Sequence, residues 1–148
     1  MKLAKALKLK NKKVSEYTKT LERMSVSNSI EQSSKKHYNS KALSELAESQ
    51  MLDLIKLKTA IHNTSEPIRS KIFRIGELKS YLGYINRLST AEGIVKSRYQ
   101  NEEPSVYIVD FNETEKTSKI KSIQEEIELL QEEMDEFNAT TNLLGYSE

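Results

Sequence analysis

Residues 120–137 read IKSIQEEIELLQEEMDEF, and this stretch decides the fold. Its large apolar side chains recur at alternating spacings of three and four residues, which places them on one face of an α-helix. Charged and amide side chains fill the positions between them. The pattern predicts a final helix over residues 113–138 whose apolar stripe packs against other helices. The stripe consists of Ile120, Ile123, Ile127, Leu130, Met134 and Phe137.

Three earlier segments carry similar periodicity and predict further helices. The first begins near the start of the chain, the second covers residues 41–63 and the third residues 70–90. Residues 25–40 hold mostly Ser, Asn, Gln and Lys, which predicts a polar loop or linker. Pro67 ends the second helix, because proline restrains the preceding residue to extended conformations. The stripe of the first segment consists of Leu3, Leu7, Val14, Tyr17, Leu21 and Met24, with Lys10 as a polar exception.

The apolar period changes to two between residues 94 and 111. Two runs, 94–99 and 106–111, flank a polar turn over residues 100–104. This alternation is typical of a β-hairpin. A lone two-stranded hairpin is marginally stable in water, so we expect it to pack on the helices or to pair with a copy from another subunit.

Together these segments predict a mainly α protein, with long antiparallel coiled-coil-like helices and a small β-hairpin before the last helix. The 148 residues are enough for one ordinary domain, and we expect a single helical domain over residues 1–148. Apolar residues make up 36% of the chain and charged residues 30%. That balance is typical of amphipathic helices that bury one stripe, and it favours a homo-oligomeric helical bundle.

Charge is unevenly distributed, although the net charge is only +1. Residues 1–27 carry eight basic and two acidic side chains, whereas residues 113–136 carry nine acidic and three basic ones. The first and last helices are therefore electrostatically complementary, within one chain or between chains. Because the last helix would neutralise the first, we do not expect binding to nucleic acid.

The chain contains no cysteine and no run of about 20 apolar residues. Lysine recurs every two or three residues at the start, so the basic opening lacks the apolar region of a signal peptide. We therefore expect a cytoplasmic protein with no membrane partner.

No catalytic, metal or cofactor motif stands out. The only histidines, His37 and His62, lie outside any short metal-ligand spacing, and no glycine-rich phosphate loop or nucleophile elbow is present. The acidic pairs of the last helix are explained by a solvated helix face. We expect no enzyme activity, no cofactor and no metal site.

Four short segments give the chain a family resemblance. They are the opening MKLAKAL (residues 1–7), IHNT (61–64), RY (98–99) before an extended run, and NATTNL (138–143) at the end of the last helix. In this order they resemble a family of small bacterial coiled-coil proteins that is sometimes labelled septicolysin. The resemblance covers nearly the whole chain, and it implies an elongated helical oligomer without an established activity.

Two functional hypotheses follow. The leading one is a non-enzymatic, oligomeric coiled-coil protein that acts as an interaction or scaffold protein. The alternative is a ligand-sequestering protein that binds a nucleotide or another small anionic phosphate compound, as a phage or bacterial signal sponge would. In that case Arg holds phosphate and Tyr stacks on a base. Ordinary helix ends and strand-forming tyrosines explain the same residues. The candidate ligand-binding residues are Asn63, Thr64, Arg98, Tyr99, Tyr107, Asn138, Thr140 and Thr141.

Overall fold

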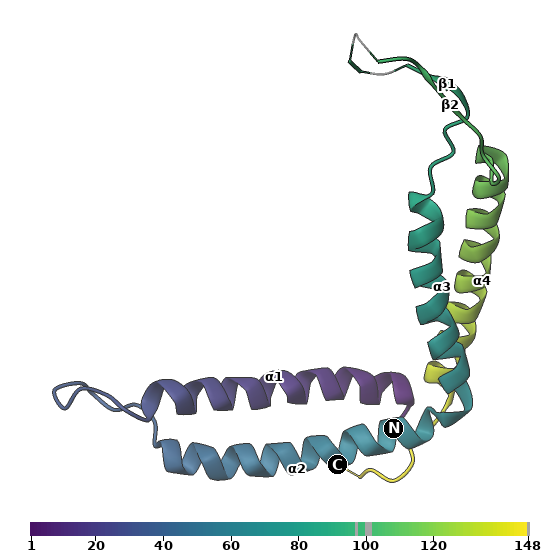
Figure 1. The fold of residues 1–148 in the computed structure, drawn as a ribbon. Helices are drawn as coiled ribbons and strands as arrows, with labels where there is room; N and C mark the ends of the chain where they lie inside the picture. The colour runs from purple at the N-terminus through teal and green to yellow at the C-terminus, as the bar shows by residue number, and fades with distance from the viewer. Residues whose placement is uncertain (97, 100–101, 148) are drawn as a thin grey trace. The chain divides into compact units, whose positions relative to one another are not determined.

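The computed structural model describes residues 1–96, 98–99 and 102–147, and it is mainly α-helical (Figure 1). Within these residues it forms four α-helices: α1 (Leu3–Ser27), α2 (Ser40–Thr64), α3 (Arg69–Arg87) and α4 (Glu113–Thr140). A 3-10 turn, η1 (Glu66–Ile68), follows α2, and the antiparallel strands β1 (Gly93–Val95) and β2 (Ser105–Tyr107) precede α4. The predicted fold class is confirmed.

Side-chain caps explain where two of the helices begin. The Asn39 side chain accepts hydrogen bonds from the backbone N–H groups of Lys41 and Ala42, at 3.0 and 3.4 Å. At the start of α4, Asn112 and Glu115 form a capping box, in which each side chain accepts a hydrogen bond from the other residue's backbone N–H. These bonds satisfy donors that the first helical turn leaves without a partner.

Two predicted segments have different limits in the structure. Helix α1 continues to Ser27, so the polar segment between α1 and α2 covers residues 28–39 rather than 25–40. The hairpin was predicted over residues 94–111, but its paired strands are only three residues long. The register pairs Gly93 with Tyr107, Ile94 with Val106 and Val95 with Ser105. In the predicted turn, residues 100 and 101 lie outside the described residues, as does residue 97 of the first predicted run.

The chain divides into two compact units, and the single helical domain over residues 1–148 stays a prediction. Unit 1 comprises Met1–Ile68 together with Asp135–Glu148, and unit 2 comprises Arg69–Met134. Unit 1 thus holds α1, α2, the last turns of α4 and the tail that follows it. Unit 2 holds α3, the hairpin and most of α4.

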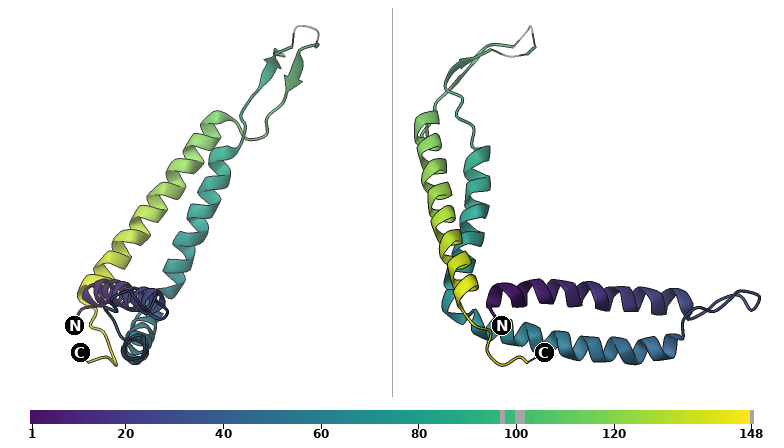
Figure 2. Two further views of the ribbon diagram at one scale, coloured as in Figure 1. Left: turned by 90° about the vertical axis from the view of Figure 1, so that its left-hand side faces the viewer. Right: turned by 180° about the vertical axis from the view of Figure 1, so that it is seen from behind.

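In unit 1, α1 and α2 run antiparallel and side by side (Figures 1 and 2). Their backbones approach within 8 Å, and the seam between them is lined largely by small residues. The predicted stripe of α1 is partly wrong, because Val14 is exposed and smaller side chains are buried instead. The small buried residues of the two helices are Ala6, Thr20, Ser27, Ser40, Ala47, Ala60 and Thr64.

In unit 2, α3 and α4 lie side by side and their backbones are further apart than those of α1 and α2. Ion pairs join them at Lys71–Glu133 (2.6 Å) and Arg74–Glu126 (2.5 Å), which shows that the helices are antiparallel. The seam consists of large aliphatic residues, of which Ile75, Ile85 and Ile123 are buried. The hairpin lies beyond the end of this helix pair (Figure 2).

The helix contacts also limit how α1 and α4, which carry complementary charges, could pair. The apolar seam of α1 is covered by α2. A pairing of α1 with α4 therefore stays a prediction, and it concerns the exposed faces of the two helices.

Within residues 1–96, 98–99 and 102–147, no helix combines the length and the apolar character that crossing a bilayer requires.

Candidate functional site

The eight predicted ligand-binding residues are divided between the two units. Arg98, Tyr99 and Tyr107 belong to the hairpin of unit 2. The other five belong to unit 1, where they lie at the ends of α2 and α4: Asn63, Thr64, Asn138, Thr140 and Thr141.

The five residues in unit 1 lie where the beginning and the end of the chain are joined. Backbone hydrogen bonds run from Leu3 N–H to the Thr141 carbonyl (2.9 Å) and from Leu143 N–H to the Met1 carbonyl (2.8 Å). Between them, Lys2 and Asn142 form an antiparallel β-bridge. We call these contacts between residues 1–3 and 141–143 the terminal clasp.

All three candidate threonines take part in this arrangement, Thr141 through its carbonyl in the terminal clasp. The buried hydroxyl of Thr64 accepts a hydrogen bond from Leu144 N–H at 3.1 Å, which ties the tail to the end of α2. At the exposed end of α4, the Thr140 carbonyl accepts a hydrogen bond from the Lys2 ammonium, and its hydroxyl donates one to the Glu136 carbonyl one turn earlier. The carbonyls at the end of α4 thus find partners that the helix itself does not supply.

A small hydrophobic core lies directly beneath the terminal clasp. Leu3 and Leu57 are fully buried in it. We call it the terminal core, and its buried members are Leu3, Ala6, Leu57, Ala60 and Leu143. Partly buried side chains surround them: Leu7, Leu9, Ile61, Phe137 and Tyr146. Three of the four segments that carry the family resemblance, residues 1–7, 61–64 and 138–143, thus meet in one place.

The remaining polar candidates of unit 1 lie nearer the surface. Asn63 is exposed and lines an open depression of about 260 Å³ between α2 and the tail, together with Lys56 and Gly145. Asn138 is half-buried in the last turns of α4. A ligand-binding role for these residues stays a prediction.

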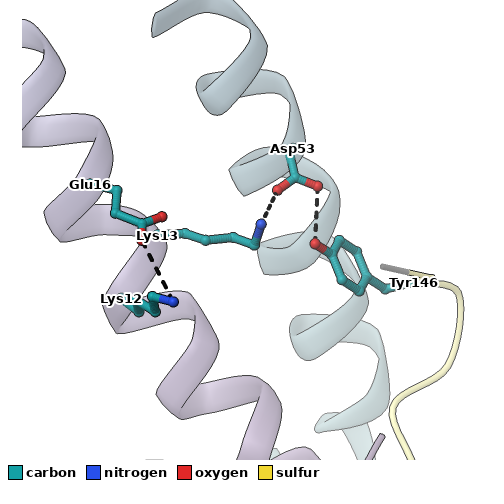
Figure 3. A network of polar contacts seen from close by, with 5 residues as sticks. All are labelled: Lys12, Lys13, Glu16, Asp53 and Tyr146. Atoms are coloured by element: carbon teal, nitrogen blue, oxygen red, sulfur yellow. Dashed lines mark hydrogen bonds and ion pairs between the residues drawn. The ribbon is translucent and has the colours of Figure 1, made fainter. Parts of the chain in front are cut away.

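A polar network on the side of unit 1 was not anticipated from the sequence. The Asp53 carboxylate of α2 lies 2.6 Å from the Lys13 ammonium of α1 and accepts a hydrogen bond from the Tyr146 hydroxyl of the tail at 3.0 Å. Figure 3 shows both side chains pointing to this carboxylate. One acidic group therefore joins two helices and the tail.

These contacts shift the pKa values of all three groups. The hydrogen bond from Lys13 is the main reason why the pKa of Asp53 is lowered, and the same bond raises the pKa of Lys13. Burial, followed by the hydrogen bond to Asp53, raises the pKa of Tyr146. At neutral pH the network therefore holds a charged Lys–Asp pair and a neutral tyrosine, and it joins two helices and the tail.

The sequence carried a weak signal for this network. Asp53 stands between two leucines of the second predicted helix, and Lys13 falls one residue before a predicted seam position. A charged residue next to the apolar face of a helix is often paired with an opposite charge when that face packs against another helix. Nothing local pointed to Tyr146, which lies 93 residues from its partner.

In unit 2, the candidate residues belong to a hairpin whose apolar side chains are largely uncovered. The exposed fractions are 72% for Ile94, 71% for Val106 and 91% for Ile108. Tyr99 and Tyr107 are exposed as well. The hairpin therefore presents apolar and aromatic side chains to the solvent on both of its faces.

The described ranges 1–96, 98–99 and 102–147 contain no group of three His, Cys, Asp or Glu side chains that could hold a metal ion. His37 is exposed in the segment between α1 and α2, and His62 is exposed in the last turn of α2.

Comparison with known proteins adds no relative. No protein-family model, no curated protein and no solved structure matches this chain.

Proposed function

We propose that this protein is a non-enzymatic, cytoplasmic interaction protein that works as a homo-oligomer, with unit 2 providing the contact surface. The observation that carries the proposal is the exposure of Ile94, Val106 and Ile108 on a two-stranded hairpin. Such hairpins need a third strand or a helix to be stable in water, and contiguous exposed apolar side chains mark interaction sites.

Helix α3 supports the same proposal. Phe73 and Tyr84 are each 65% exposed, and Tyr81 and Leu88 are also exposed. Aromatic residues are enriched in the central parts of interfaces, where they contribute much of the binding free energy. In unit 1, by contrast, hydrogen bonds at the helix ends and the network at Asp53 already join α1, α2 and the tail.

Membership of the septicolysin-labelled family remains part of the proposal and rests on the four short sequence segments. It is compatible with a small helical oligomer. Ligand sequestration by Arg98, Tyr99 and Tyr107 stays the alternative.

Light scattering coupled to size-exclusion chromatography tests the proposal. The mass of the purified protein should exceed the 17.0 kDa of one chain at micromolar concentration. Ile108→Ser should lower the oligomeric fraction without lowering the melting temperature of unit 1. The matched control is Leu144→Ser, because Leu144 is also exposed, at 69%, but lies in unit 1. A wild-type protein that is monomeric at this concentration would contradict the proposal.

A further inference from the structure

The hairpin has two open edges. In the described part of the chain, β1 and β2 pair only with each other. Each outer edge therefore carries backbone N–H and C=O groups that another strand could pair with. The residues at the two edges differ, and this difference indicates which edge can accept a partner strand.

The β2 edge opposes pairing with a second β2. Pro104, directly before this strand, has no backbone N–H to donate. In an antiparallel pair centred on Val106, Glu102 of one copy and Asp110 of the other would also lie at the same end of the contact, outside the three-residue strand. Like charges brought to the same end of a contact repel each other. This repulsion would occur twice between the two β2 strands, because a twofold interface repeats every contact.

The β1 edge is self-complementary. Glu92 and Lys96 lie two residues before and two residues after Ile94, and both are exposed. In an antiparallel pair centred on Ile94, Glu92 of one copy and Lys96 of the other flank the short strand at the same end of the contact, and the same pair of opposite charges recurs at the other end. Gly93, between Glu92 and Ile94, has a φ of 79°, so the extended backbone that can pair is short.

The same register aligns apolar side chains across one face. Ile94 and Val106 are directly opposite each other in the hairpin, so their side chains lie on the same face. Pairing β1 with β1 of the partner copy would place Val106 and Ile94 of each chain in one continuous row of four. Both side chains are now about 70% exposed. The row would remove apolar surface from water at the centre of the contact.

From this geometry we infer that a second copy of this chain binds at the β1 edge, and that the two hairpins form a four-stranded antiparallel sheet with Ile94 opposite Ile94 of the partner copy. The inference rests on the proposed function and specifies its partner and its contact. It also accounts for the hairpin itself, which gains the further strands that a two-stranded sheet needs.

Cysteine cross-linking tests the register, because the natural chain contains no cysteine. Residues directly opposite each other in an antiparallel pair have Cα atoms about 4.5 or 5.5 Å apart, which a disulfide can bridge. Ile94→Cys should therefore form a covalent dimer of twice 17.0 kDa under mild oxidation. Val106→Cys is the matched control, because Val106 has nearly the same exposure but would lie three strand spacings, about 14 Å, from its counterpart.

Each outcome decides between the alternatives. A dimer from Ile94→Cys and none from Val106→Cys supports the inference. A dimer from Val106→Cys alone would assign the contact to the β2 edge, and equal cross-linking of both would indicate random collision; both results overturn it. If neither cross-links while light scattering still detects an oligomer, the inference is wrong and the proposed function stands. A monomer in light scattering contradicts both.

A charge-swap experiment gives an independent measurement. Glu92→Lys and Lys96→Glu should each weaken the dimer, by roughly three- to tenfold in dissociation constant, because each replaces two attractions with two repulsions. The double variant Glu92→Lys with Lys96→Glu should recover the wild-type value within about twofold. If both single variants dimerise like the wild type, or if the double variant does not recover, the two residues do not face each other.

Discussion

The two helix pairs of this protein are built from side chains of different size. Between α1 and α2 most of the buried residues are Ala, Ser and Thr, beside Leu3, Leu54 and Leu57, and the backbones approach within 8 Å. Between α3 and α4 the seam is lined by Ile and Leu, and the backbones are further apart. The distance between packed helices depends on the side chains at their contact, so the difference follows directly from the sequence.

Each kind of helix contact leaves some apolar surface poorly buried. A seam of small residues packs closely but removes little apolar surface from water, so unit 1 depends on the terminal core and on polar contacts. A seam of large residues removes more apolar surface from water. In a pair of helices, however, each helix has only one neighbour to cover its apolar face. In unit 2, Leu78, Leu82, Ile120 and Ile127 consequently remain partly buried rather than fully covered.

The largest expected effect tests the dependence of unit 1 on its core. Leu57→Ala empties a fully buried site, and it should lower the free energy of unfolding by about 2–5 kcal/mol. Leu52→Ala on the same helix is the control, because Leu52 is 57% exposed and its loss should change the stability by less than about 0.5 kcal/mol. Urea unfolding followed by circular dichroism measures both. Equal losses would mean that the terminal core does not hold unit 1 together.

A second substitution tests the close approach of α1 and α2. Ala47→Leu adds three carbon atoms to a buried seam position, and overpacking should cost about 1–3 kcal/mol. The exposed Ala42 provides the control, since Ala42→Leu on the same helix has room for the larger side chain. Thermal unfolding of the two variants distinguishes them. If Ala47→Leu were as stable as the control, the small-residue seam would not set the distance between the helices.

The tail contact should contribute less. Tyr146→Phe keeps the ring that packs on the terminal core but removes the hydroxyl that donates to Asp53. The loss of one partly exposed hydrogen bond should cost about 0.5–1.5 kcal/mol. Chemical unfolding measures this loss, and hydrogen exchange of the Leu144 amide should become faster. A variant that matches the wild type in both measurements would show that the hydroxyl of Tyr146 does not help to hold the tail.

The smallest expected effect depends on pH. The lowered pKa of Asp53 means that its ion pair stabilises the fold above the ordinary carboxyl pKa, and that this contribution disappears as the pH falls through the folded-state value. The stability gap between the wild type and Asp53→Asn, about 1 kcal/mol or less for a partly exposed pair, should therefore shrink below about pH 4. Melting temperatures between pH 7 and pH 2.5 test this. A gap that stays constant, with the exposed Glu45→Gln as control, would mean that the carboxylate is not paired in solution.

Local patterns in the sequence predicted the helices well. Predicted ranges of 41–63, 70–90 and 113–138 compare with observed helices at Ser40–Thr64, Arg69–Arg87 and Glu113–Thr140. The agreement has a physical basis, since apolar periodicity, proline and capping residues all act within a few positions along the chain. The large residues of the α4 stripe are indeed turned inwards, with Ile123 buried and the others half-buried.

The same reasoning failed where small or distant residues decide the structure. The predicted stripe of α1 favoured Val14 over Thr20, because a size-based pattern does not reveal that close helices bury small polar side chains. Thr20 tolerates burial because its hydroxyl donates to the Glu16 carbonyl one turn earlier. The terminal clasp could not be predicted either, since it joins residues 138 or more positions apart and no local period records such a contact.

The terminal clasp determines when unit 1 can finish folding during synthesis. Chains leave the ribosome from the N-terminus at about 5–20 residues per second, so α1 and α2 can pair while later residues are still being translated. Leu3 and Leu57, however, receive Leu143 as a neighbour only after all of unit 2 has been made. A nascent chain that stops before residue 143 would leave this apolar site uncovered for chaperones and proteases to recognise. Closure of unit 1 can thus occur only after the whole of unit 2 has been translated.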